Sequence, residues 1–145
     1  MPALTKDIDT TFLRSRLDRL GVCLDALDDA EDATAGRLAG EVGAEYFEVA
    51  LEQSGKLLKK RLRPWFASNR QADRLTFRDV FRHAAKHGLI DVEATERWLG
   101  YRGAVDGLVD REDDGPFDAT AVDLLRAFLD DASALADTID DAPRD

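Results

Sequence analysis

Leucine recurs at intervals of three and four residues near the start of this chain. The five positions are Leu13, Leu17, Leu20, Leu24 and Leu27. Because an α-helix turns once in about 3.6 residues, this spacing gathers all five side chains on one helical face, whereas a strand would require alternation. Similar apolar spacing returns in four later segments, and β-branched alternation is nearly absent. The sequence therefore predicts an all-α protein, an up-and-down bundle of four or five helices.

The second helix is expected to be long, covering about 37–66. Pro64 should end or bend it, because proline lacks the backbone N–H that a helix interior needs. The helix carries two apolar stripes, one made of Phe47, Leu51, Leu58 and Leu62 and the other of Val42, Tyr46, Val49 and Leu57. Two adjacent stripes form a wide apolar face, which suits a helix that packs against several others.

Helix-end signals delimit the other helices. Thr76 and Asp79 have the spacing of a capping box, and Gly88 suits the position just beyond the end of the short helix that follows. Asp91 is placed to cap a fourth helix that reaches about residue 105, and Asp118 to cap a last helix that runs to about residue 139.

The polar stretches 28–35 and 67–75 are expected to be connections, and no internal repeat is present. At 145 residues the chain has the length of one ordinary domain. We expect a single helical-bundle domain over 1–145, with an ordered core over about 10–139 and an acidic tail at 140–145.

Charge is distributed unevenly. The chain carries a net charge of −10, yet residues 56–87 contain ten cations and only two acids, which leaves −18 for the remainder. The basic segment either balances the acidic surface or docks a polyanion or an acidic partner. Arg78, Arg82 and His87 are its candidate contact residues.

Targeting signals and cysteine pairs are missing from the sequence. No apolar run approaches the roughly 18 residues that a membrane span needs. Residues 1–9 contain no apolar core of a signal peptide, and Cys23 has no second cysteine to pair with. We expect a cytoplasmic protein with no membrane contact, cofactor or metal.

Three blocks of the sequence resemble the nucleotidyltransferase substrate-binding branch of the HEPN superfamily. They are FEVALEQSGKLLK at 47–59, TFRDVFRHAAKHGLID at 76–91 and WLGYR at 98–102. The likeness covers roughly residues 13–139. It implies a helical bundle, usually a homodimer, that forms a complex with a minimal nucleotidyltransferase encoded nearby and contacts nucleotide or RNA. Some members supply the substrate-binding half of that enzyme. Others are ribonuclease toxins that act on RNA.

The ribonuclease motif of that family is degenerate in this chain. Alignment on Trp98 and Tyr101 places Val105 where the family has Arg, Asp106 at the polar position, Asp110 at the His and Glu112 at a modifiable Tyr. Cleavage of RNA needs a cation beside the phosphate and a group that exchanges protons near neutral pH. Valine and ionised aspartate provide neither. We therefore expect a non-catalytic substrate-binding or partner subunit, the alternative being a HEPN-type ribonuclease toxin.

Other candidate sites are less complete. Arg102 lies one helical turn before Val105 and, with Tyr101, is a candidate contact for nucleotide, RNA or partner. Arg82 and His87 match the nuclease spacing, but residues five apart on a helix point about 140° apart. The acidic loop 110–115 resembles half of a calcium-binding loop; its twelfth position is Ala121 rather than the bidentate Glu, so a plain acidic loop is favoured.

Overall fold

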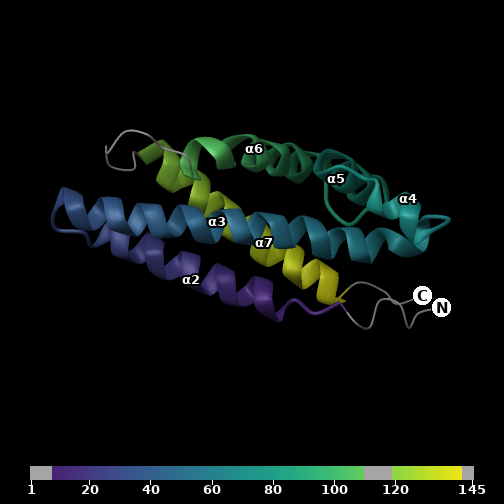
Figure 1. The fold of residues 1–145 in the computed structure, drawn as a ribbon, viewed down its shortest axis with the longest axis horizontal. Coiled ribbons are helices and arrows are strands. Elements are labelled where there is room, and N and C mark those ends of the chain that lie inside the picture. The colour runs from purple at the N-terminus through teal and green to yellow at the C-terminus, as the bar shows by residue number, and fades with distance from the viewer. Residues whose placement is uncertain (1–7, 110–118, 142–145) are drawn as a thin grey trace.

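α3 (Ala33–Leu62) is the central helix of the bundle. In the computed structural model, which describes residues 8–109 and 119–141, α2 (Thr11–Asp28) lies along one side of α3 (Figure 1). α6 (Val92–Val109) lies along the other side, and α7 (Ala119–Asp141) crosses behind and contacts α2, α3 and α6. The expectation of an all-α bundle is confirmed.

Three short helical elements stand together at one end of the bundle (Figure 1). They are the 3₁₀ helix η1 (Arg63–Trp65), α4 (Asn69–Asp73) and α5 (Phe77–Lys86). The stretch 67–75 is therefore not a plain connection as predicted. Ser68 begins α4 there by accepting a hydrogen bond from the Gln71 N–H at 3.1 Å. Periodicity could not reveal this helix, because it buries a single residue, Ala72.

Capping side chains determine where the long helices begin. α3 starts four residues earlier than predicted, because the Asp32 carboxylate accepts a hydrogen bond from the Ala35 N–H at 2.8 Å. The same helix ends at Leu62, four residues before the predicted end at about residue 66. Pro64 lies in the 3₁₀ turn that follows, as expected for a proline that ends a helix. Asp118 lies outside the described residues.

The helix-end signals around α5 are confirmed. Thr76 and Asp79 form the capping box in both directions. Gly88 has a positive φ of 76°, a conformation that glycine adopts without strain. Asp91 caps α6 by accepting a hydrogen bond from the Ala94 N–H at 2.6 Å.

An aromatic cluster forms the centre of the core. Phe47 meets Phe128 edge to face at 4.8 Å, and Phe81 stacks on Trp98 at 4.7 Å. The first stripe of α3 is fully buried around them. The second stripe is not: Leu57 is buried, but Val42 is 43% exposed, and Tyr46 and Val49 are half-buried. The wide apolar face predicted for this helix is therefore only half covered. No helix in the described ranges has the length and apolar content of a membrane span.

Candidate functional site

α6, the helix whose sequence was aligned above with the nuclease motif of the HEPN superfamily, directs two of the aligned positions into the core. Val105, which occupies the arginine position of the motif, is 2% exposed, and Tyr101 one turn earlier is 4% exposed. Trp98 is buried between Phe81 and Phe128. The structure therefore does not bring Tyr101 to the surface, and Val105 belongs to the hydrophobic core rather than to an exposed phosphate-binding position.

The hydroxyl of Tyr101 connects α6 to α7. It donates a hydrogen bond to Asp131 Oδ2 at 2.5 Å, and Arg97 donates two more to the same carboxylate at 2.8 and 2.9 Å. Burial and the neighbouring carboxylate both raise the pKa of Tyr101. Burial alone would raise the pKa of Asp131, but the hydrogen bonds from Arg97 and Tyr101 outweigh it and lower that pKa. This is a structural ion-pair network between two helices.

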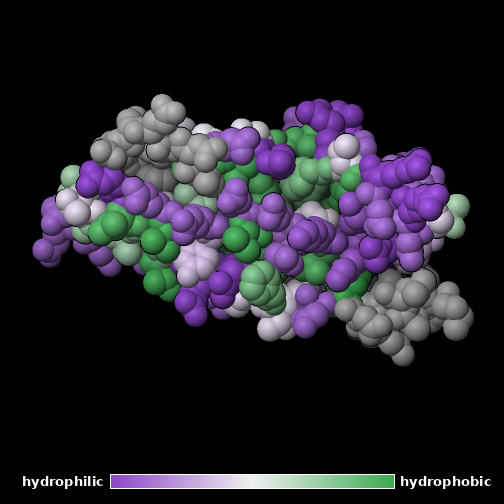
Figure 2. Space-filling model, viewed as in Figure 1, coloured by the Kyte–Doolittle hydropathy of each residue, from purple (hydrophilic) through white to green (hydrophobic). Residues whose placement is uncertain are grey.

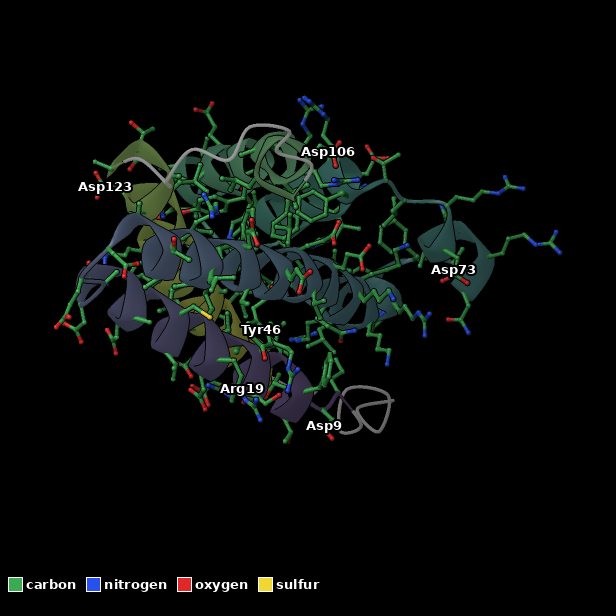
Figure 3. The ribbon with its side chains drawn as sticks, turned by 60° about the vertical axis from the view of Figure 1, so that its left-hand side comes forward. Asp9, Arg19, Tyr46, Asp73, Asp106 and Asp123 are labelled. Atoms are coloured by element: carbon green, nitrogen blue, oxygen red, sulfur yellow. The ribbon has the colours of Figure 1, made fainter. Side chains whose placement is uncertain are left out.

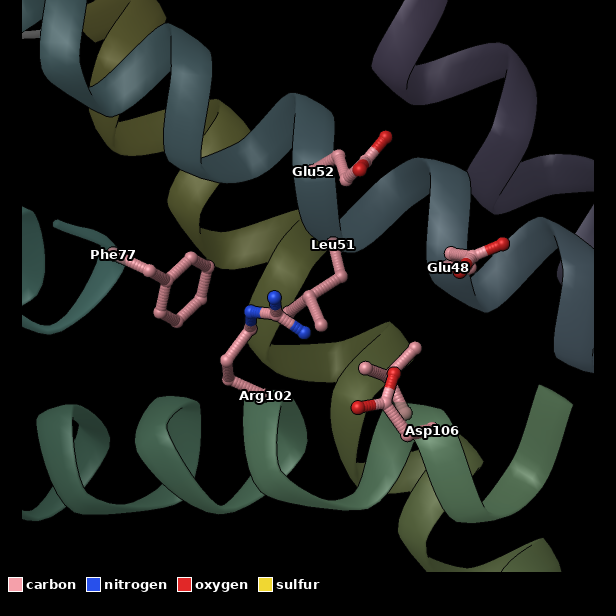
Figure 4. Close-up of a pocket in the computed structure, with 7 residues that line it drawn as sticks. Glu48, Leu51, Glu52, Phe77, Arg102 and Asp106 are labelled. Carbon is pink, nitrogen blue, oxygen red and sulfur yellow. The ribbon is translucent and has the colours of Figure 1, made fainter. Parts of the chain in front are cut away.

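Arg102 lies in a small cavity between α3 and α6 (Figure 4). The cavity has a volume of about 120 Å³, and its side chains are Glu48, Leu51, Glu52, Phe77, Arg102, Val105 and Asp106. Figure 4 shows the Arg102 side chain rising from α6 towards α3, with Phe77 on one side and Asp106 on the other. Three carboxylates thus line the same cavity as one guanidinium. A phosphate would be repelled by more charge than attracts it, so Arg102 does not replace the missing cation of the motif.

The remaining motif positions, Asp110 and Glu112, lie outside the described residues, as does the acidic loop 110–115. Within residues 8–109 and 119–141 no three His, Cys, Asp or Glu side chains are grouped as a metal site.

Exposed cations gather at the end of the bundle formed by the last turns of α3, α4 and α5. Seven of the ten cations counted in 56–87 are exposed: Lys56, Lys60, Arg70, Arg74, Arg78, Arg82 and Lys86. We call these seven residues the basic surface. Arg61 is instead buried, where its guanidinium lies over the Trp65 ring. Figure 2 shows hydrophilic residues covering this end of the molecule on the face that it draws.

The two acids in this segment offset only part of the positive charge of the basic surface. Asp73 forms an ion pair with Arg63 at 3.1 Å, and Asp79 accepts the backbone N–H of Thr76 in the capping box. That hydrogen bond lowers the pKa of Asp79 and keeps it ionised in this role. The basic surface therefore keeps most of its positive charge and faces solvent.

The two histidines of α5 pack against aromatic rings that precede α4. His87 stacks on Trp65 with the ring centroids 4.1 Å apart, and His83 meets the edge of Phe66 at 5.0 Å. Burial lowers the pKa of His87, and the nearby His83 and Lys86 lower it further. Arg82 points into solvent on another side of the helix. Arg82 and His87 do not converge on one point as a nuclease pair would.

Sequence reasoning missed several residues of these sites. Trp65 and Phe66 lie in a stretch that has no periodicity, and nothing in the sequence pairs them with α5. Arg97 and Asp131 are 34 residues apart and show no local signal. The charge count of residues 56–87 did reveal the basic surface.

Comparisons with protein-family models, with curated proteins and with solved structures find no match to this chain. The resemblance to the HEPN superfamily therefore depends on the three sequence blocks alone.

Proposed function

We propose that this chain is a non-catalytic binding subunit of a small nucleotidyltransferase, and that the basic surface is its contact with that enzyme or with the nucleotide that the enzyme handles. The observation that carries the proposal is the separation of two features. The exposed cations lie on α3, α4 and α5, whereas the motif position on α6 holds a buried valine.

The surroundings of the motif favour binding over cleavage. Arg102, the cation that lines the same cavity as Val105, shares that cavity with Glu48, Glu52 and Asp106. This cavity includes Phe77, the first residue of α5. Both histidines of the chain instead pack on aromatic rings at the C-terminal end of α5. General acid–base chemistry on RNA requires a proton-exchanging group beside a phosphate-binding cation. Among the described residues no such pair converges.

The charge pattern also supports an anionic or acidic contact. The basic surface has seven exposed cations, and its segment contains only two acids. Such a surface produces a positive electrostatic field that attracts polyanions and speeds association with acidic proteins. Because the rest of the chain is strongly acidic, this end is the part of the surface where such an encounter is favoured.

The test is a binding titration between the purified chain and the nucleotidyltransferase encoded beside it. The variant Arg78→Glu/Arg82→Glu/Lys86→Glu should bind at least about tenfold more weakly, because rim charges act on both association and affinity. Arg102→Glu is the comparison variant and should bind as the wild type does. If Arg102→Glu weakened binding and the triple variant did not, the contact with the nucleotidyltransferase would lie on α6 rather than on the basic surface.

An RNA-cleavage assay on the same samples tests the rival function. We expect no cleavage above that of a His87→Ala variant. Cleavage by the wild type that the variant loses would identify a ribonuclease.

A further inference from the structure

A second cavity lies beside the one that contains Arg102. It lies between the second half of α3 and the start of α5, and Phe77 lines both cavities. Its volume is about 180 Å³. Because a cavity of about 150 Å³ is large enough for a benzene-sized group, this one can take a ring or a short branched chain. We call it the α3–α5 pocket.

The wall of the α3–α5 pocket is apolar. Its uncharged lining residues are Gly55, Leu75, Phe77 and Val80. A Cβ at Gly55 would lie 3.2 Å from Phe77 Cδ2, so the glycine allows the phenyl ring to lie directly against α3. Phe77 also packs on Phe81 with the ring centroids 4.6 Å apart, and Val80 is 1% exposed. The core therefore supports this wall from behind.

Three charged side chains complete the lining of the pocket. They are Glu52, Lys56 and Lys59, which follow one another along one side of α3 at intervals of four and three residues. Glu52 and Lys56 are exposed, and Lys59 is half-buried. None of the three forms an ion pair within the described part of the chain. Two ammonium groups thus accompany one carboxylate, which leaves the pocket with one excess positive charge.

Other carboxylates near this end of the bundle do not cancel that charge. Asp73 forms its ion pair with Arg63, and Asp106 lines the cavity of Arg102 rather than the α3–α5 pocket. Figure 3 shows these two aspartates far apart, Asp73 on α4 and Asp106 on α6. The pocket therefore combines an apolar wall with an unpaired positive charge.

We propose that the α3–α5 pocket binds a small carboxylate that carries an aromatic or branched apolar group. The apolar group lies against Phe77 and Val80, and the carboxylate lies between the ammonium groups of Lys56 and Lys59. An apolar lining with a few charged groups is typical of small-molecule sites. One negative charge matches the excess charge of the pocket, whereas a nucleotide phosphate brings more charge and is better held by the paired donors of arginine.

This site does not depend on the proposed function. Lys56 belongs to both the pocket and the basic surface. Arg78, Arg82 and Lys86, whose substitution tests the contact with the nucleotidyltransferase, do not line the pocket. Failure of one binding activity therefore leaves the other measurable.

NMR titration of the purified chain with phenylacetate tests the site first. The amide signals of Gly55, Phe77 and Val80 should shift and saturate with a Kd on the order of 1 mM, the range expected for a ligand of about ten non-hydrogen atoms. Phenethylamine, which has the same ring and a positive charge, should bind at least about tenfold more weakly. Three results would overturn the proposal: no saturation with phenylacetate, equal binding of phenethylamine, or tighter binding of AMP at the same signals.

Substitution of one lysine tests which charge holds the carboxylate. Lys59→Gln keeps most of the side chain and removes its charge, so it should weaken phenylacetate binding by about threefold to fivefold. Binding of the neutral phenethyl alcohol should not change. Lys60→Gln is the matched control, because Lys60 is the next residue and does not line the pocket. Equal affinities of the two variants for phenylacetate would contradict the assignment.

Substitution of the glycine tests the apolar wall. The methyl group of Gly55→Ala would meet the Phe77 ring at 3.2 and 3.3 Å, so the ring must shift into the pocket or away from it. Both phenylacetate and phenethyl alcohol should then bind more weakly, while circular dichroism shows the helix content of the wild type. Unchanged affinity for both ligands would place their apolar group elsewhere and overturn the proposal.

Discussion

The imidazole of His87 lies flat against the indole of Trp65, with the ring planes 8° apart. This stacking joins the end of α5 to the turn that follows α3, and it shields one of the two histidines from water. Burial is the main cause that lowers the pKa of His87. The neutral form of the ring is therefore favoured more than in a free imidazole.

Replacement of Trp65 by alanine should raise the pKa of His87 towards its ordinary value. In the wild type the folded state binds a proton at His87 less readily than the unfolded state does. The free energy of unfolding therefore has its full value, as far as His87 is concerned, above about pH 6.5, and it declines as the pH falls below that value. Trp65→Ala should reduce that decline. An NMR titration of the His87 ring measures the shift directly. If the titration midpoint of His87 in the wild type were at or above its midpoint in Trp65→Ala, the stacking on Trp65 would not be the cause of the lowered pKa.

Loss of the Tyr101 hydroxyl should destabilise the fold. Tyr101→Phe removes a hydrogen bond to an ionised carboxylate, and we expect the free energy of unfolding to fall by about 1–2 kcal/mol. Tyr46→Phe is the matched control, because the Tyr46 hydroxyl makes no hydrogen bond within the described residues; its effect should stay within about 0.5 kcal/mol. Denaturant unfolding measures both. Equal decreases in the free energy of unfolding for the two variants would show that the hydrogen bond from Tyr101 to Asp131 does not stabilise the fold.

An arginine at position 105 of α6, where the family that the sequence resembles carries one, should disrupt the bundle. Val105 is 2% exposed and belongs to the hydrophobic core, so Val105→Arg forces a larger, charged side chain into the core and should cost roughly 3 kcal/mol or more. Asp106→Arg, one residue further along, lies on the exposed side of the helix and should change stability by no more than about 0.5 kcal/mol. Thermal unfolding followed by circular dichroism compares the two. Equal stability of the two variants would place Val105 outside the core.

Two glycines with open space around them should respond to alanine in opposite directions. A Cβ at Gly103, within α6, or at Gly88 would meet nothing within 4 Å. Gly103→Ala should therefore stabilise the fold by about 0.5–1 kcal/mol through helix propensity. Gly88→Ala should destabilise it by about 1–2 kcal/mol, because the backbone there has a positive φ. Melting temperatures that move in the same direction would be inconsistent with these two backbone conformations.

Local signals predicted much of the fold because they require only neighbouring residues. The leucine stripe of α2, the capping box at Thr76 and the turn at Gly88 each depend on spacing within a few residues. α4 and the early start of α3 were missed, since each depends on one polar side chain in a stretch without an apolar stripe.

Long-range features of the candidate site were beyond sequence reasoning. The spacing of α3 showed two apolar stripes, but spacing does not reveal how many helices cover them, and Val42 is consequently exposed. The hydrogen bond between Tyr101 and Asp131 joins residues 30 apart in the chain. The charge of the basic surface was predictable by counting, whereas its separation from Val105 required the fold.

Purification of the tagged chain from its own cells tests whether it forms a complex with a small nucleotidyltransferase. We expect that a small nucleotidyltransferase, with a Gly-Ser followed at a distance by Asp-x-Asp, copurifies with the wild type. The triple variant Arg78→Glu/Arg82→Glu/Lys86→Glu should recover much less of it, and mass spectrometry quantifies both. A wild-type chain that elutes without any nucleotidyltransferase would contradict the account.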